Sequence, residues 1–252
     1  MKTASLAVAA SLLGAALVLS PVAEAAELKI IVGGSMTASI NAIAPEFEKA
    51  TGHKLVTHFD STPNIITRVN SGTPFDAVVV PVDVFKDAAA KARFAVGPTI
   101  DIARVGYGVI VRSGAPKPDI STPDAFKKAL LDAPSVALLP TSAAGAYVAK
   151  VFERLGIAEA VKAKTKVAAT PAGIPEAVAK GEAELGVFLT NVLISPGVEL
   201  VGPFPGDLQQ ELVFSAAAAA DTREPDAAKA LIDYLRSPAA TAVIKAKGMT
   251  PG

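Results

Sequence analysis

The sequence predicts an α/β protein of two lobes, each a mostly parallel sheet flanked by helices, with two crossing strands that join them. Short apolar runs alternate with segments of helical period, which is typical of a parallel sheet covered by helices. Two breaks rich in glycine and proline, near 112–123 and 202–210, bracket a middle block with the same alternation. A block inserted in this way separates two lobes, and the cleft between such lobes is a preferred place for a ligand.

Residues 1–25 have the layout of a secretory signal peptide. Lys2 supplies a positive charge, an apolar run follows as far as Leu19, and residues 23–25 form an A-x-A cleavage pattern. The alternative is a membrane anchor, but the run contains serine and glycine and is shorter than the roughly 20 apolar residues of a span. We therefore predict a periplasmic protein that is cleaved after Ala25.

The first lobe is predicted from residues 26–104 and 220–252. Apolar runs at 28–32, 55–59 and 77–80 predict its strands, and the last run is continuously apolar, which is typical of a strand buried on both faces. Apolar residues at helical spacing predict helices over about 40–51, 65–69 and 84–93, and around 228–235 and 243–244.

The second lobe is predicted from residues 112–210. Its helices are expected near 124–131, 144–155 and 175–180, and its strands at 136–139, 166–168 and 185–189. The two crossing strands are expected at 105–111 and 211–219. The second of these overlaps the segment 212–220, which ends in five consecutive alanines, and because alanine prefers a helix this strand contradicts the local propensity.

The charge and the absence of cysteine exclude several classes of protein. Lysine plus arginine and aspartate plus glutamate number 24 each, which favours neither nucleic acid nor an anionic membrane surface as a partner. Without cysteine the chain has no disulfide, no thiolate metal site and no lipoprotein anchor. We expect a freely diffusing monomer that is not attached to a lipid.

Several short motifs follow one another in the order seen in the periplasmic molybdate-binding proteins of ABC importers, which the chain resembles over essentially its whole mature length. They are VGGSMTA at 32–38, FDST at 59–62, GTPFD at 72–76, AAGAY at 143–147, GEAELGV at 181–187 and GMTP at 248–251. This resemblance implies a type II periplasmic binding fold. It also implies a small anion, a tetrahedral oxyanion, held between the lobes by neutral donors and delivered to a membrane permease.

The resemblance implies that Ser35, Thr62 and Ala144 contact the ligand. Ser35 is expected where a strand ends and a helix begins, so its hydroxyl and the N–H groups of Met36 and Thr37 could face an anion. A plain helix cap is the alternative role for both Ser35 and Thr62. Ala144 would contribute its backbone N–H.

The predicted pocket departs from the family pattern in its donors. Pro63 has no N–H to offer, and a carboxylate at Asp60 would repel an anion if it faced the cleft. Leu189 occupies the position of a tyrosine whose hydroxyl contacts the oxyanion, and Pro171 falls where the family uses a backbone N–H. Asn191, together with Thr190, could supply replacement donors.

A small organic acid or another polar metabolite is therefore the alternative ligand. An organic carboxylate usually recruits arginine, and Arg68 and Arg104 are the candidates, although surface arginines are more commonly solvated or ion-paired.

The residues do not predict an enzyme, a metal site or a cofactor. His53 and His58 would point to opposite faces of a strand, so they would not chelate a metal together. No nucleophile elbow, H-E-x-x-H motif or phosphate loop is present in the sequence. The alternative is a secreted enzyme or sensory module on the same scaffold, because a fold does not fix a function.

Overall fold

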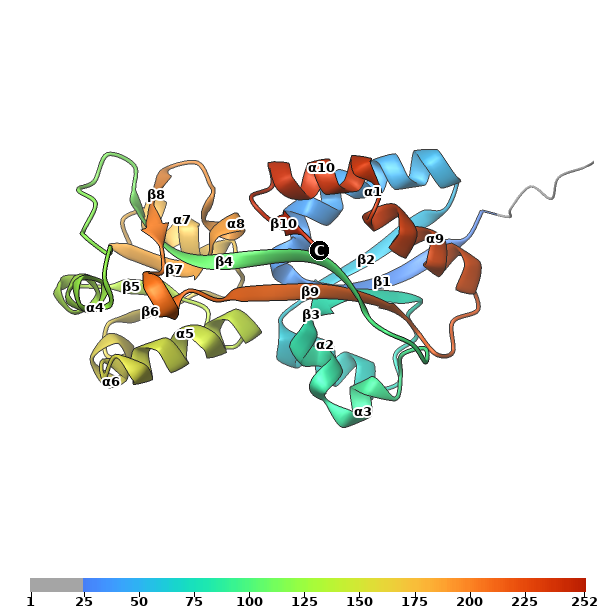
Figure 1. Ribbon diagram of the computed structural model, residues 1–252, viewed down its shortest axis with the longest axis horizontal. Helices are drawn as coiled ribbons and strands as arrows, with labels where there is room; N and C mark the ends of the chain where they lie inside the picture. Colours follow the sequence, from blue (N-terminus) through green and yellow to red (C-terminus); the bar gives the residue numbers. More distant parts are fainter. Residues whose placement is uncertain (1–24) are drawn as a thin grey trace, which may run out of the picture.

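The computed structural model describes residues 25–252 and confirms the α/β fold (Figure 1). Two groups of helices and strands lie at the two ends of an elongated molecule, and β4 (Ile100–Arg112) and β9 (Glu211–Ala218) run side by side between them. The predicted signal peptide lies outside the described residues, apart from Ala25. Within residues 25–252, no helix has the length and apolar character needed to cross a membrane.

The first group is built on parallel strands. β1 (Glu27–Gly33) pairs with β2 (Lys54–Asp60) on one side and with β3 (Ala77–Pro81) on the other. β9 then pairs antiparallel with β3, and the short β10 (Thr250–Pro251) pairs with β4. The helical segments here are η1 (Gly34–Met36), α1 (Thr37–Thr51), α2 (Thr62–Asn70), η2 (Val82–Lys86), α3 (Ala88–Lys91), α9 (Pro225–Leu235) and α10 (Pro238–Ala246).

Helices cover both faces of this sheet, α1, α9 and α10 on one side and α2 and α3 on the other (Figure 1). Ala77 and Val79 of β3 belong to the core cluster that includes α1, α9 and α10. Val78 and Val80 belong to a second cluster with α2 and α3. Successive strand residues point to opposite faces, so a strand covered on both sides must be apolar throughout.

The second group has its own sheet. β5 (Val136–Leu138) lies between β6 (Thr165–Val167) and β7 (Leu185–Leu189) and is parallel to both, while β8 (Val198–Pro203) pairs with β4. Its helical segments are α4 (Pro123–Asp132), α5 (Ala143–Arg154), α6 (Ala158–Lys162), α7 (Gly173–Ala179), α8 (Thr190–Leu193) and η3 (Gly206–Leu208).

β4 belongs to both sheets. Its residues 100–106 pair with β9, residues 107–110 pair with β7, and residues 108–112 pair with β8. The order β2-β1-β3-β9-β4-β7-β5-β6 is therefore continuous through the centre of the molecule. The exact lobe boundaries given above stay a prediction.

The structure differs from the predicted elements in several places. Instead of one helix over 84–93, η2 and the short α3 are present, and Asp87 caps α3 by accepting the N–H of Ala90 at 2.8 Å. α6, α8 and β8 were not predicted, because each is too short or too irregular to show a period. β9 is a strand despite its alanines, since pairing with β3 and β4 overrides their helix propensity.

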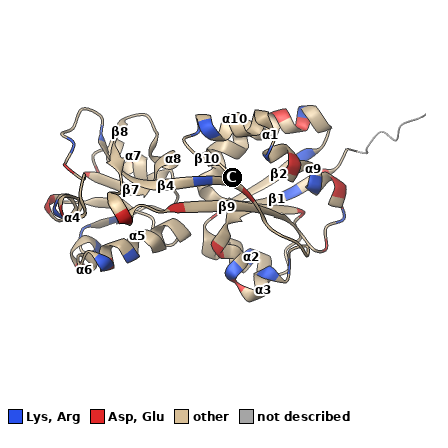
Figure 2. Cartoon of the chain, in the orientation of Figure 1, with Lys and Arg blue, Asp and Glu red and all other residues tan. Residues whose placement is uncertain are grey.

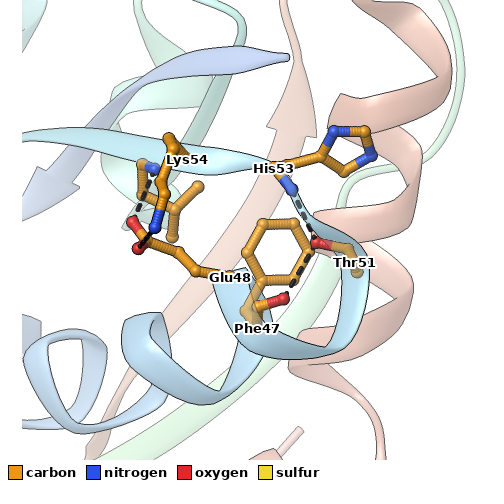
Figure 3. A network of polar contacts seen from close by, with 6 residues as sticks. Phe47, Glu48, Thr51, His53 and Lys54 are labelled. Atoms are coloured by element: carbon orange, nitrogen blue, oxygen red, sulfur yellow. Dashed lines mark hydrogen bonds and ion pairs between the residues drawn. The ribbon is translucent and has the colours of Figure 1, made fainter. Parts of the chain in front are cut away.

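A polar network closes the turn from α1 into β2 (Figure 3). Thr51 Oγ1 donates to the carbonyl of Phe47 at 2.9 Å and accepts the N–H of His53 at 3.3 Å. Lys54 Nζ lies 2.7 Å from a carboxylate oxygen of Glu48. The buried His53 accepts the N–H of Ala26 through Nδ1 at 3.1 Å, so this ring has a structural role.

Candidate ligand-binding site

A cavity of about 890 Å³ lies between the two groups of elements. One wall comes from the end of β1, from η1, the start of α1, the end of β2 and the start of α2. The other wall comes from the segments that precede α5 and α7 and from α8. Residues far apart in the sequence therefore lie side by side here, because the order of the strands brings their ends together.

The N-termini of three long helices reach this cavity. Its lining includes Thr37 and Ala38 of α1, Thr62 and Asn64 of α2, and Ala144 of α5. The N–H groups of a first helical turn have no acceptor within the helix, and the helix dipole places partial positive charge at this end. Such an arrangement favours a negatively charged ligand.

No lysine, arginine or histidine is among the described residues that line the cavity, and its charged side chains are Asp60 and Glu176. Both signs of charge are present in both halves of the molecule (Figure 2), and Lys86 and Lys150 line a second, neighbouring cavity. Arg104 pairs with Asp101 and does not reach the main cavity. An anion in it would therefore be held by neutral donors.

Five of the six predicted ligand-binding residues line the cavity. They are Ser35, Thr62, Ala144, Pro171 and Asn191. Leu189 is absent from the lining because it is fully buried in β7, opposite Tyr107 of β4. Its neighbour Phe188 lines the cavity instead, as the alternation of side chains along a strand requires.

The local geometry corrects two expectations about the first helix. Ser35 lies inside η1, and Met36 is the residue that precedes α1, so Ser35 is not the helix cap. The N–H of Thr37 donates to the carbonyl of Gly34, and its hydroxyl donates to the same oxygen at 2.6 Å. The Thr37 N–H is therefore not free for a ligand, and the expectation that it would be was wrong.

At the α5 end of the cavity, a backbone N–H of the first helical turn has no partner among the described residues. Ser142 caps the helix by accepting the N–H of Gly145 at 2.9 Å, and its own hydroxyl donates to the carbonyl of Leu139 at 2.9 Å. Ala144 is buried, and its N–H makes no hydrogen bond with the described residues. Ser142 was missed in the sequence, although a serine before a helical period is a cap signal.

Two hydrogen bonds join the walls across the cavity. Asn191 Nδ2 donates to the carbonyl of Ser35 at 2.8 Å, and the N–H of Ala143 donates to Thr62 Oγ1 at 3.3 Å. The amide oxygen of Asn191 is buried without a partner among the described residues. The two walls are therefore in contact, and residues expected to bind a ligand also hold the walls together.

Asp60 is held at the end of β2 by three donors. Its Oδ1 accepts the N–H of Ser61 and the Nδ2 of Asn64, both at 2.7 Å, and its Oδ2 lies 3.3 Å from His58 Nε2. Burial raises the pKa of Asp60, but the hydrogen bonds from Asn64, Ser61 and His58 outweigh it, so the pKa lies below its usual value. Asp60 is therefore ionised at neutral pH.

Two lobes with a cavity between them define a two-lobed ligand-binding protein of the type II periplasmic class. The family described as bacterial extracellular solute-binding protein matches residues 28–250, and the chain belongs to this family. The molybdate-binding resemblance seen in the sequence motifs is also confirmed, by relatives and by a solved structure.

Two relatives and one solved structure illustrate the range of the family. The chain is 35% identical over 232 residues to an aconitate isomerase of Pseudomonas sp., covering 89% of this chain and 87% of the relative. It is 34% identical over 242 residues to the molybdate-binding protein ModA of Azotobacter vinelandii, covering 94% of each. The solved periplasmic molybdate-binding protein of Azotobacter vinelandii superposes with a TM-score of 0.73 at 20% identity, covering 88% of this chain and 98% of that one.

Proposed function

We propose that the protein captures a small anion in the cavity between its lobes and delivers it to the membrane permease of an ABC importer. The observation that carries this proposal is the meeting of three helix N-termini at a cavity whose described lining has no cationic side chain. Neutral donors of this kind favour an anion without the desolvation of a buried lysine or arginine. The proposal includes a periplasmic monomer, cleaved after Ala25, with no lipid anchor and no nucleic-acid partner.

The proposed donors are the hydroxyls of Ser35 and Thr62 and the backbone N–H of Ala144. Thr62 Oγ1 accepts the N–H of Ala143, and none of the described hydrogen bonds uses the hydroxyl hydrogens of Ser35 or Thr62. Both hydrogens are therefore available to an anion. In this proposal Asn191 holds the lobes together, and Pro171 forms a wall without a donor.

A molybdate-like oxyanion is the first ligand to test, because the relative from Azotobacter vinelandii is named for molybdate binding. Titration calorimetry with molybdate, tungstate and sulfate in a chelator-free buffer should give saturable binding. The S35A variant should bind more weakly, whereas R68A, which changes an arginine outside the cavity, should bind as the wild type does. No heat with any of the three anions would exclude an oxyanion ligand and leave the binding-protein class in place.

An organic polycarboxylate, bound or isomerised, is the second candidate. The relative named aconitate isomerase supports it, and the cavity of about 890 Å³ lies within the roughly 300–1,000 Å³ of small-molecule sites. Isomerisation by proton transfer needs a base, and Glu176 lines the cavity with a carboxylate whose one ion pair among residues 25–252 is with Lys180 Nζ, at 3.9 Å.

Incubation of the protein with cis-aconitate, followed by proton NMR, tests this second candidate. The trans isomer should accumulate with the wild type and much more slowly with E176Q. A thermal shift with aconitate but no isomer would support a carboxylate binder without catalysis. If aconitate gives no thermal shift and no isomer forms, the polycarboxylate is excluded as a ligand or substrate.

A further inference from the structure

We infer that Asp60 sets the charge preference of the cavity, because its carboxylate lines the cavity and is fixed there just before the N-terminus of α2. The inference rests on the proposed anion binding and specifies which anions the site favours. The inference concerns the ratio of two affinities, that of a singly charged anion to that of a doubly charged anion of the same shape. We expect Asp60 to raise this ratio.

The first step is the position of the carboxylate. Asp60 Oδ1 accepts the N–H of Ser61, which precedes the first residue of α2, and the side-chain amide of Asn64 in the first turn. Pro63 removes a further donor from this turn. The N–H of Ser61 and the side-chain amide of Asn64 are therefore already used by a group of the protein itself, and the carboxylate of Asp60 is held in place beside the start of α2.

The second step is the contrast with the other long helices at the cavity. Asp60 lies two residues before α2, whereas neither the first turn of α1 or α5 nor the four residues before each of them contains an acidic residue, so the dipoles of these helices act on a ligand without a neighbouring carboxylate. The negative charge at the cavity is thus concentrated at the α2 wall and at Glu176. The side chain of Asp60 is 27% exposed and that of Glu176 is 63% exposed, so solvent screens Glu176 more.

The third step is the effect on a ligand. Repulsion from a fixed carboxylate grows in proportion to the charge of the ligand, so a dianion is weakened about twice as much, in free energy, as a monoanion in the same position. A carboxylate in contact with the cavity, in surroundings less polar than water, should change this preference by at least about tenfold.

Perrhenate and tungstate provide the test, because both are tetrahedral oxyanions of similar size and they differ by one charge. Their affinities should be measured by calorimetry for the wild type, D60N, D60S and the control E159Q, which removes an exposed carboxylate outside the cavity. D60N keeps an oxygen to accept the bonds from Ser61 and Asn64, and its new amide can donate to His58 Nε2 when the ring proton is on Nδ1. We expect D60N and D60S to bind perrhenate at least about tenfold and tungstate at least about a hundredfold more tightly, with a less than threefold change for E159Q.

Each outcome has one meaning, provided that thermal unfolding shows the variants to be folded. A tungstate-to-perrhenate affinity ratio that stays the same in D60N and D60S, while the wild type binds either anion, overturns the role of Asp60 and keeps the proposed function. If no variant binds either oxyanion, the role of Asp60 is overturned as well. If aconitate also fails to bind, the proposed function fails with it.

Discussion

Gly145, in the first turn of α5, is the position where a single methyl group should disturb both the fold and the site. A Cβ built there would lie 1.9 Å from the carbonyl oxygen of Leu139 and 2.8 Å from the Cα of Pro140. Both are backbone atoms that cannot turn aside as a flexible side chain can. The loop before α5, which carries the capping Ser142 and lines the cavity, would have to move.

The expected cost of G145A follows from three contributions to the free energy of unfolding. Overpacking costs about 1–3 kcal/mol, and displacement of the Ser142 cap costs about 1 kcal/mol. Alanine is favoured over glycine within a helix by about 1 kcal/mol, which offsets the lost cap. The net expectation is a destabilisation of roughly 1–3 kcal/mol, with weaker ligand binding because the N–H of Ala144 moves with the loop.

Urea unfolding followed by circular dichroism is the suitable assay, since the chain has no tryptophan. The matched control is G173A, in the first residue of α7, where the nearest atom to the new Cβ is the Cβ of Ala168 at 3.3 Å. G173A should change the stability by less than about 1 kcal/mol. A stabilised G145A, as helix propensity alone would give, would refute the close approach of α5 to the backbone of Leu139.

Three further changes test other parts of the structure. T62V removes the acceptor of the Ala143 N–H and the proposed donor hydroxyl, so the anion affinity measured by calorimetry should fall about tenfold or more. The affinity of T62S should stay within about threefold of the wild type, because it keeps the hydroxyl. Equal affinities for T62V and the wild type would contradict the role of the hydroxyl. S142A should lower the unfolding free energy in urea by about 0.5–2 kcal/mol, and no loss would show that the cap is unimportant. The hydrogen bond from the Lys54 side chain is the largest cause that lowers the pKa of Glu48. This carboxylate therefore stabilises the fold above its unfolded-state pKa, and the stabilisation is lost as the pH falls through the folded-state pKa. Thermal midpoints at a series of acid pH values should therefore fall less steeply for E48Q, and identical slopes would exclude this contribution.

The lobed α/β fold could be predicted from the sequence because its signals are local and repeated. The continuous apolar run of β3 predicts a strand buried on both faces, and the structure covers it with helices on both sides. Elements without a period escaped, such as the single turn of α8 and the irregular β8. Pairing with neighbouring strands can also override helix propensity, as the alanines of β9 show.

The residues that line the cavity were predictable where the residue type and the helix start coincide, and less so where the side-chain direction matters. Ser35, Thr62 and Ala144 each lie at or near a helix start, and the structure brings all three to the cavity wall. Alternation along β7 requires Phe188 and Leu189 to face opposite sides, but the sequence does not say which side holds the cavity. That choice depends on the pairing of β7 with β4, which is a long-range feature.

In the proposed function, the contact between the two walls and the orientation of a ligand donor are linked at Thr62. When the N–H of Ala143 donates to Thr62 Oγ1, it occupies one lone pair of that oxygen and leaves the hydroxyl hydrogen to point elsewhere. The lining of the cavity includes Thr62, so an anion there can accept this hydrogen, and the bond across the lobes orients the donor in advance. By the reciprocity of coupled equilibria, an anion that accepts from Thr62 must stabilise the contact with Ala143 to the same extent. In the proposed function, the bond between Ala143 and Thr62 therefore contributes to anion binding as well as to the contact between the two walls.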